Sequence, residues 1–335
     1  MAPNADEDLI ESLLRPVGQL SMTDILRLQE RLSRELRNRF EKDLALAFSD
    51  VVGSTPYFER FGDEAGRKLQ QRHFDLLSAT VVPAGGRIVD TAGDGAFLVF
   101  QTADIAAGAL VELQKELSRQ NAGFAREHQL VLRLGFHFGS ELTDGKQVTG
   151  ESVNLASRVA GSGAPGEIRL TKDAFRALGS VIHRLSSRSI GEVTLKGISR
   201  PVEMLTLGWR DRDQFPECVR VKETGQEIDL PSKDTIAFGR LGMNEGYEAN
   251  EVVLSLPDEV LTRKISRWHF ELRRHPEGMS LRQVSDQMTE VDGAAIAKGA
   301  DAAIRAGTVV RAGRVITLEF FSRPTPETFA TSESA

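Results

Sequence analysis

The stretch Leu44-Ala-Leu-Ala-Phe-Ser-Asp-Val-Val-Gly-Ser-Thr55 begins as an apolar run and ends in small and polar residues. An apolar run of this length, bounded in this way, is typical of a buried β-strand. We expect the strand to end near Asp50, so that this carboxylate lies at the edge of a sheet. After it, Gly53, Ser54 and Thr55 would let backbone N–H groups approach a phosphate.

A second carboxylate follows in a predicted hairpin. Residues 87–92 and 96–100 are β-like and flank Gly93-Asp-Gly95, which predicts two antiparallel strands joined by a tight turn. Taken alone, such a sequence is most often only a turn. Together with the preceding strand, however, it can bring Asp50 and Asp94 to one edge of a sheet. Two carboxylates placed in this way suit Mg²⁺ or Mn²⁺.

Predicted strands and helices alternate around these motifs. We expect helices at 64–82, 103–120 and 152–159, and further strands at 130–138, 193–197 and 201–207. This interleaving predicts an α/β or α+β domain over residues 43–208.

The N-terminal segment, residues 1–42, has a helical pattern. Apolar residues recur every three or four positions from Leu9 to Phe40, with a break at residues 15–18. Two interpretations of this amphipathic helix stay open. It either packs on its own domain or pairs two copies of the chain.

The composition changes after Trp209. A charged stretch predicts a linker at residues 209–216, and short β-like runs then recur over residues 217–322. They are residues 218–221, 235–238, 252–254, 269–272, 279–281, 308–310 and 315–320. We expect an all-β sandwich here, followed by a flexible polar tail at residues 323–335.

Composition excludes several classes of protein. The 335 residues suggest about two domains. With 42 Lys and Arg against 48 Asp and Glu, the net charge of -6 gives no cationic field for nucleic acid or an anionic membrane. Cys218 is the single cysteine, so no intrachain disulfide forms. The start is acidic and no apolar run approaches about 18 residues, so we expect a cytoplasmic protein with neither a membrane nor a nucleic-acid partner.

Four motifs occur in one order between residues 44 and 207. They are Phe48-Ser-Asp-Val-Val-Gly-Ser-Thr55, Asp90-Thr-Ala-Gly-Asp-Gly95, Gly150-Glu-Ser-Val-Asn-Leu-Ala-Ser-Arg158 and Leu195-Lys-Gly197. In this order they closely resemble the class III adenylate and guanylate cyclases. The resemblance implies an α+β, ferredoxin-like catalytic domain with an antiparallel-rich sheet and helices. It also implies conversion of a nucleoside triphosphate into a 3′,5′-cyclic nucleotide and pyrophosphate.

The resemblance assigns roles to individual residues. Asp50, Asp94 and the carbonyl of Val51 match metal ligands, Asn154 and Arg158 match catalytic residues, and Lys196 matches a triphosphate ligand. It further implies two Mg²⁺ or Mn²⁺ ions. In the family, each site combines the aspartates of one subunit with the Asn/Arg pair of the other, so a homodimer is implied. The rival interpretation is a catalytically inactive, cyclase-like dimeric scaffold that binds phosphothreonine proteins.

The base of the substrate is left open between ATP and GTP. By position, Asp90 and Gln147 match the residues that read the base. Adenylyl cyclases commonly have a lysine at the position of Asp90 and an aspartate or threonine at that of Gln147. Guanylyl cyclases commonly have a glutamate and a cysteine at these positions. Asp90 can accept from guanine or adenine N–H groups while the Gln147 amide donates to guanine O6 or adenine N1. A base that buries the Asp90 carboxylate and satisfies only one of its oxygens binds at a cost, and this consideration favours guanine. ATP, however, is the commoner substrate among bacterial-type relatives, and we place ATP slightly ahead.

Four motifs of the C-terminal half resemble a forkhead-associated (FHA) domain, a module that binds phosphothreonine peptides. They are Phe238-Gly-Arg240, Asn250-Glu-Val-Val-Leu254, Ile265-Ser-Arg-Trp-His269 and Thr289-Glu-Val-Asp-Gly293. The resemblance assigns phosphate contacts to Arg240 and Ser266, with assistance from Thr289. Asp292 departs from the family pattern, in which an asparagine holds the peptide backbone. A structural or protein-docking sandwich is therefore the alternative.

Overall fold

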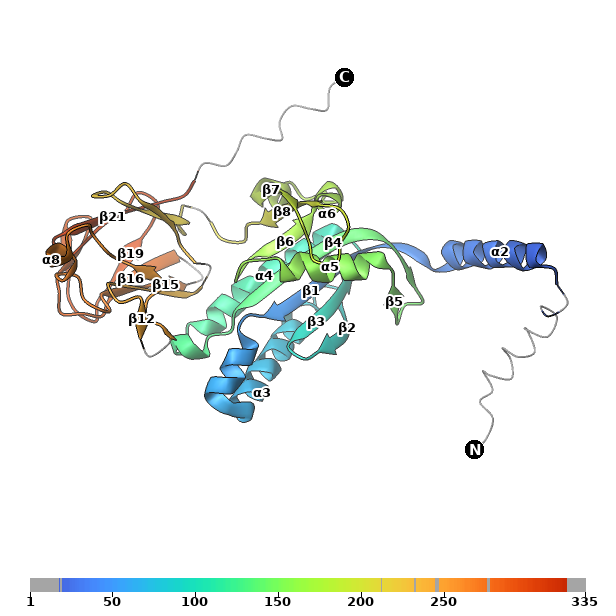
Figure 1. Ribbon diagram of the computed structural model, residues 1–335, viewed down its shortest axis with the longest axis horizontal. Helices are drawn as coiled ribbons and strands as arrows, with labels where there is room; N and C mark the ends of the chain where they lie inside the picture. The colour runs from blue at the N-terminus through green and yellow to red at the C-terminus, as the bar shows by residue number, and fades with distance from the viewer. Residues whose placement is uncertain are drawn as a thin grey trace, which may run out of the picture.

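A computed structural model describes residue 18 and residues 20–211, 213–231, 233–244, 247–275 and 278–323. Three parts follow one another along its longest axis (Figure 1). They are helix α2 (Met22–Phe40), an α+β domain and an all-β domain.

The α+β domain has one large sheet. Its elements are β1 (Glu41–Val51), α3 (Ser54–Thr80), β2 (Arg87–Ala92), β3 (Gly95–Phe100), α4 (Ala103–Asn121), a 3₁₀ turn (Arg126–His128), β4 (Leu132–Thr143), β5 (Val148–Thr149), α5 (Glu151–Gly161), β6 (Ile168–Thr171), α6 (Lys172–Arg176), α7 (Val181–Ser186), β7 (Ser187–Val193) and β8 (Val202–Leu207). The strand order is β2-β3-β1-β4-β6-β8-β7, with β5 paired to β4. Only the β4–β6 pairing is parallel among the described strands of this sheet.

The first part of this sheet has a ferredoxin-like arrangement. The chain runs β1-α3-β2-β3-α4-β4, and these strands lie in the order β2-β3-β1-β4. The expected α+β, antiparallel-rich fold is therefore confirmed. The predicted β2–β3 hairpin is also present, with Gly93 (φ 64°) and Asp94 in its turn.

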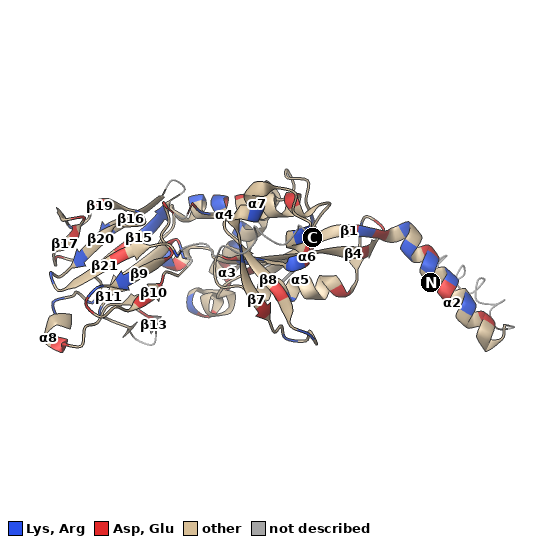
Figure 2. Ribbon diagram, turned by 90° about the horizontal axis from the view of Figure 1, so that it is seen from above, with Lys and Arg blue, Asp and Glu red and all other residues tan. Residues whose placement is uncertain are grey.

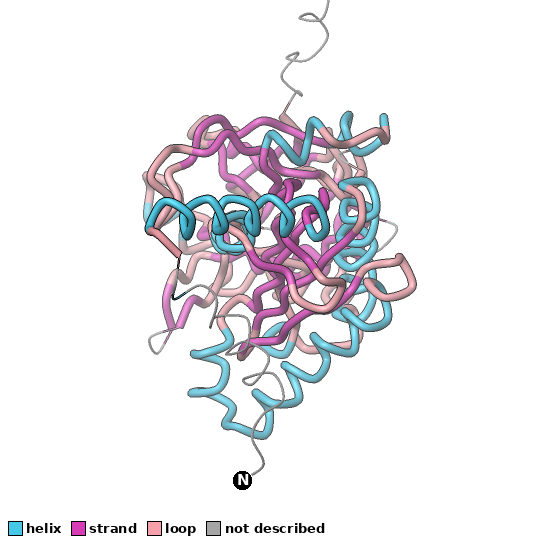
Figure 3. Tube along the Cα trace, turned by 90° about the vertical axis from the view of Figure 1, so that its right-hand side faces the viewer, coloured by secondary structure: helices cyan, strands magenta, loops and turns pink. Residues whose placement is uncertain are grey.

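Helices cover both faces of the central strand β1. Successive side chains of a strand point to opposite faces. Ala45 and Ala47 pack with leucines and alanines of α3 and α4, whereas Leu44 and Leu46 pack with Ala156 of α5. Figure 3 shows this layering from the side at which α2 projects, with helices on either side of the strands.

Helix α5 approaches β4 closely at Gly135. A Cβ atom there would lie 2.4 Å from the backbone nitrogen of Ala160. Only glycine leaves room for the helix at this point. This close packing fixes α5 against the sheet.

The all-β domain is built from two sheets. One has the order β10 (Glu227–Asp229), β9 (Cys218–Val221), β21 (Ile316–Phe321), β20 (Val309–Ala312), β17 (Thr289–Val291) and β18 (Ala294–Ile296). The other has the order β14 (Val252–Val253), β11 (Thr235–Gly239), β15 (Phe270–His275), β16 (Gly278–Gln283) and β19 (Asp301–Ile304). A short pair, β12 (Met243–Asn244) and β13 (Tyr247–Glu248), and helix α8 (Glu259–Thr262) complete it. Alternate residues of these strands, among them Phe238, Phe270 and Phe320, form one apolar core. The predicted all-β architecture is confirmed.

Two predicted boundaries are wrong. Helix α3 begins at Ser54 rather than near residue 64, because a kink at Gly62 (φ 81°) interrupts its pattern. The strand expected at 193–197 is absent. Strand β7 ends at Val193, and Lys196 lies in a turn with Gly197, which has φ 81°.

Helix α2 projects from the domain (Figures 1 and 2). It begins after Ser21, whose hydroxyl accepts a hydrogen bond from the Asp24 N–H, and β1 follows it directly. None of its residues is buried, and the expected apolar stripe, which includes Ile25, Leu32 and Leu36, is exposed. The first interpretation, a helix packed on its own domain, is therefore wrong for Met22–Phe40. Residues 9–17 and 19 of the predicted helix, and the tail beyond Arg323, lie outside the described residues.

Candidate active site

Strand pairing brings the two predicted metal aspartates to one edge of the sheet. Asp50 lies near the end of β1, and its partner across the antiparallel pair is Gly95. Asp94 directly precedes Gly95 in the hairpin turn. Residues directly opposite in such a pair have Cα atoms about 5 Å apart. Both aspartates are half-buried.

Each carboxylate already has a partner. Asp50 forms an ion pair with Arg133 of β4, and both side chains are about one-third exposed. The hydroxyl of Ser54 donates a hydrogen bond to Asp94. Sequence reasoning missed Arg133, because its position opposite Asp50 follows only from the β1–β4 register.

Residues 52–53, which follow Asp50 and Val51, form a loop that leads into α3. Gly53 takes a left-handed conformation (φ 70°) directly before the helix, so that a residue with a side chain would be strained there. Val51 is buried. The Val52 N–H donates to the Val131 carbonyl at 2.9 Å, which ties this loop to the start of β4.

A buried histidine supports the same region and was also missed. His73 of α3 is fully buried, and its Nε2 lies 2.9 Å from the Ser49 hydroxyl. Burial lowers the pKa of His73 to about 4, although the nearby Asp94 acts in the opposite direction. The imidazole is therefore neutral at pH 7 and adds no positive charge beside the aspartates.

The predicted catalytic pair lies on α5. Asn154 and Arg158 are one helical turn apart and exposed, as is Lys196 after β7. Within the described residues, no hydrogen bond or ion pair joins any of these three side chains to Asp50 or Asp94. Within one chain, the two aspartates and the Asn154/Arg158/Lys196 group therefore have no direct bond to each other.

The start of α5 rests on a buried carboxylate. Glu141 of β4 is 3% exposed, and a Cβ atom on Gly150 would lie 1.6 Å from its Oε2. Burial raises the pKa of Glu141, and interactions with the hydroxyl and N–H of Ser152 lower it in part. An acceptor at the first turn of a helix stabilises its free N–H groups.

The two residues predicted to read the base lie on neighbouring segments. Asp90 is in β2 and Gln147 precedes β5, and both are exposed. Arg87 of β2 donates to the Lys146 carbonyl at 2.5 Å, which connects the segments. The Asp144 carboxylate accepts from the Gln147 N–H at 2.8 Å and fixes this loop.

The structure brings two of the three predicted phosphate-binding residues of the sandwich together. The Arg240 N–H donates to the Ser266 carbonyl at 3.0 Å, so these two residues are neighbours. Thr289 differs from the expectation. It is fully buried and donates its hydroxyl to Gln283 at 2.6 Å, and therefore cannot contact a bound phosphate.

Asp292 has a structural partner. Its backbone has φ 49° in the β17–β18 turn, and its carboxylate accepts from the Val309 N–H at 2.8 Å. This hydrogen bond gives the Asp292 side chain a structural role, and the residue lies at the surface.

A sequence model of the adenylate and guanylate cyclase catalytic domain family matches residues 37–208. This range is more than half of the chain and contains both aspartates and the Asn/Arg pair. The chain belongs to this family. Within the described ranges, the cyclase domain has no cluster of three or more His, Cys, Asp or Glu side chains that could hold a metal ion. No described helix has the length and apolar character needed to span a bilayer.

Known relatives match about half of the chain or somewhat more. A putative adenylate cyclase of Rhizobium meliloti is 26% identical over 196 residues, which are 58% of this chain and 32% of the relative. The receptor-type guanylate cyclase gcy-13 of Caenorhabditis elegans is 26% identical over 222 residues, 58% of this chain and 21% of the relative. The chain thus spans a third or less of the length of these relatives. Among solved structures, the adenylyl cyclase CyaB of P. aeruginosa is 27% identical with a TM-score of 0.44, covering 52% of this chain and 97% of that one.

Proposed function

We propose that the chain is a metal-dependent nucleotide cyclase that forms a 3′,5′-cyclic nucleotide and pyrophosphate. The observation that carries the proposal is the meeting of Asp50 and Asp94 at one sheet edge in a domain of the cyclase family. In the reaction, the ribose 3′-oxygen bonds to the α-phosphorus and the bond to the leaving pyrophosphate breaks. The proton of the 3′-hydroxyl passes to solvent.

The donor set fits two Mg²⁺ or Mn²⁺ ions. Two carboxylates and the Val51 carbonyl provide only oxygen ligands, and such ions complete their shells with water and substrate phosphates. Bound there, the ions would acidify the 3′-hydroxyl and neutralise phosphate charge. Asp50 would exchange its ion pair with Arg133 for a metal ion, and the Arg133 guanidinium would then face the triphosphate. The N–H groups of residues 53–55 would contact the same phosphates.

The second half of the site is proposed to come from another copy of the chain. Asn154 would orient the ribose, and Arg158 would stabilise negative charge on the pentavalent phosphorus. Lys196 would contact the triphosphate. The absence of any bond between these side chains and the aspartates in the described chain supports a homodimer with shared sites. The exposed apolar stripe of α2 supports pairing as well.

A product assay tests the proposed function. The full-length protein is incubated with ATP or GTP and Mn²⁺ or Mg²⁺, and cyclic nucleotide and pyrophosphate are measured. Product must exceed that of the Asp94→Ala variant. Equal, background levels would reject the cyclase and leave the dimeric scaffold.

The substrate base is proposed to depend on Asp90 and Gln147. Relatives named as adenylate and guanylate cyclases both match the chain, and we retain ATP slightly ahead of GTP. The double variant Asp90→Lys, Gln147→Asp should raise the ratio of kcat/KM for ATP over GTP by at least about tenfold. The reason is that a lysine donor and an aspartate acceptor replace the ambiguous pair. An unchanged ratio in a folded, active variant would show that these residues do not read the base.

The C-terminal sandwich is proposed to be an FHA-like module that docks or regulates the cyclase through a phosphothreonine protein. The adjacent Arg240 and Ser266 support this proposal, and Thr289 is no longer part of the phosphate site. A guanidinium forms charge-assisted hydrogen bonds with phosphate.

A binding comparison tests this module in the full-length protein. A phosphothreonine peptide should bind more tightly than its unphosphorylated form, and Arg240→Ala should reduce this preference about tenfold or more. Arg220→Ala is the matched control, since Arg220 pairs with Glu227 on another strand. Equal binding of both peptides by the wild type would favour the structural sandwich.

A further inference from the structure

A buried carboxylate joins the two domains. Asp234, directly before β11, accepts from the Ser118 hydroxyl at 3.1 Å and from the Asn121 amide at 2.8 Å, both in the last turns of α4. Arg210, after β8, donates to it at 2.6 Å. Asp234, Ser118 and Asn121 are all buried. A buried carboxylate with three donors is strongly oriented, and loss of its partners is costly.

A second carboxylate of the sandwich holds the segment that follows α4. Glu251, whose side chain is 2% exposed, accepts from Arg126 at 2.5 Å and from Lys233 at 3.1 Å. Burial alone would raise the pKa of Glu251, but the Ala237 N–H and the two cations hold it below its ordinary value. The carboxylate therefore stays charged at pH 7, and Arg126 attaches the segment between α4 and β4 to the sandwich.

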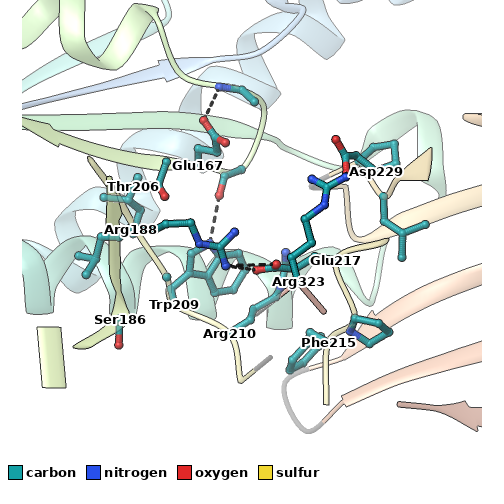
Figure 4. A pocket seen from close by; sticks show the side chains of 18 of the residues that line it. Glu167, Ser186, Arg188, Thr206, Trp209, Arg210, Phe215, Glu217, Asp229 and Arg323 are labelled. Carbon is teal, nitrogen blue, oxygen red and sulfur yellow. Dashed lines mark hydrogen bonds and ion pairs between the residues drawn. The ribbon is translucent and has the colours of Figure 1, made fainter. Parts of the chain in front are cut away.

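Two cavities lie between the domains, next to these polar groups. One, of about 680 Å³, is lined by Arg188, Trp209, Glu217 and other residues of both domains (Figure 4). The second, of about 360 Å³, is also lined by residues of both domains and reaches Asp234 itself. Domain contacts without a large apolar interface move readily. The Asp234 and Glu251 contacts hold the domains together, with the Arg188–Glu217 ion pair and the hydrogen bond from Gln129 to Thr235.

Asn121 also holds the chain that leads into the active site. Its amide donates to the Leu130 carbonyl at 2.7 Å, and its carbonyl accepts from the Leu130 N–H at 2.9 Å. The carbonyl of the next residue, Val131, accepts a hydrogen bond from the Val52 N–H in the loop that follows Asp50. Two residues later, Arg133 pairs with Asp50. Asn121, which contacts the sandwich, is therefore linked through Leu130 to the segment that contacts both Val52 and Asp50.

We propose that Asp234 and Asn121 are positioning residues, through which the docked sandwich holds the loop at Asp50–Val52 and Arg133 in the metal-binding arrangement. This inference rests on the proposed cyclase activity. Docking through Asp234 supports activity, and its loss weakens metal binding. Neither residue touches substrate.

The test compares Asp234→Ala with Asp286→Ala in the full-length protein. Asp286 is an exposed aspartate of the same sandwich and pairs with Lys298. Asp234→Ala should raise the Mn²⁺ concentration for half-maximal velocity about threefold to tenfold, and Asp286→Ala should leave it unchanged. Asp234→Asn, which keeps one acceptor, should show a smaller rise, and it replaces Asp234→Ala if that variant does not fold.

Hydrogen exchange supplies a readout that needs no turnover. The Val52 N–H should exchange faster in Asp234→Ala than in Asp286→Ala. Equal metal constants and equal Val52 exchange in these variants would overturn the inference, as would higher activity in Asp234→Ala. If the wild type forms no cyclic nucleotide, the proposed function fails, while Val52 exchange still decides whether the sandwich positions the loop.

Discussion

Replacing Asp50 with asparagine is expected to lower kcat at least about a hundredfold. Asparagine keeps the size of the side chain and an acceptor for Arg133, but it removes the negative charge that would hold a divalent ion. The Arg133 guanidinium then stays in the site without its counter-ion. The rate of cyclic nucleotide formation is measured at saturating Mn²⁺ and nucleotide.

The same strand offers a matched control. Asp43 lies at the other end of β1, is exposed, and accepts a hydrogen bond from its cross-strand partner Ser140. Asp43→Asn removes the same charge from the same strand and should leave kcat unchanged. An equal loss in both variants would mean that Asp50 acts on the stability of β1 and not on metal binding.

Combining two chains that carry different inactivating substitutions in one dimer is expected to restore cyclase activity. Asp50→Ala and Arg158→Ala should each lose at least about a hundredfold as homodimers. A heterodimer of the two, isolated through two affinity tags, should regain about half of the wild-type activity. One of its two sites then combines the intact aspartates of one chain with the intact Arg158 of the other.

A second heterodimer is the control for this experiment. Chains with Asp50→Ala and Asp94→Ala carry their lesions in the same half of the site, so every shared site of their heterodimer is damaged. No recovery is expected. Recovery in this control, or none in the first heterodimer, would contradict a site shared between two chains.

Part of the placement of the candidate site residues could be predicted from local sequence. The β2–β3 hairpin follows from residues that are adjacent in the chain, and the turn places Asp94 beside the end of β1. Asn154 and Arg158 share a helix face because their spacing is one turn. The boundaries of α3 and β7 were missed where Gly62 and the turn at Gly197 interrupt the pattern.

Residues whose partners are distant in the chain were not predictable in the same way. Arg133 meets Asp50 across 83 positions, and His73 meets Ser49 from another element. Thr289 was assigned to a surface site by its place in a motif, yet the side chain points into the core of the sandwich. Strand alternation decides this, and a shift of one residue reverses the face.

The sequence by itself determined the order of the motifs, the oxygen ligands available to the proposed metal site and the division into an α+β and an all-β part. These properties depend on residue type and short spacing. Only the tertiary structure decided that Arg133 neutralises Asp50, that one chain leaves Asn154 and Arg158 unconnected to the aspartates, and that Asp234 of the sandwich binds Asn121 of the cyclase domain. Strand register and domain docking arise from contacts between residues that are distant in the chain, and short-range sequence patterns do not reveal such contacts.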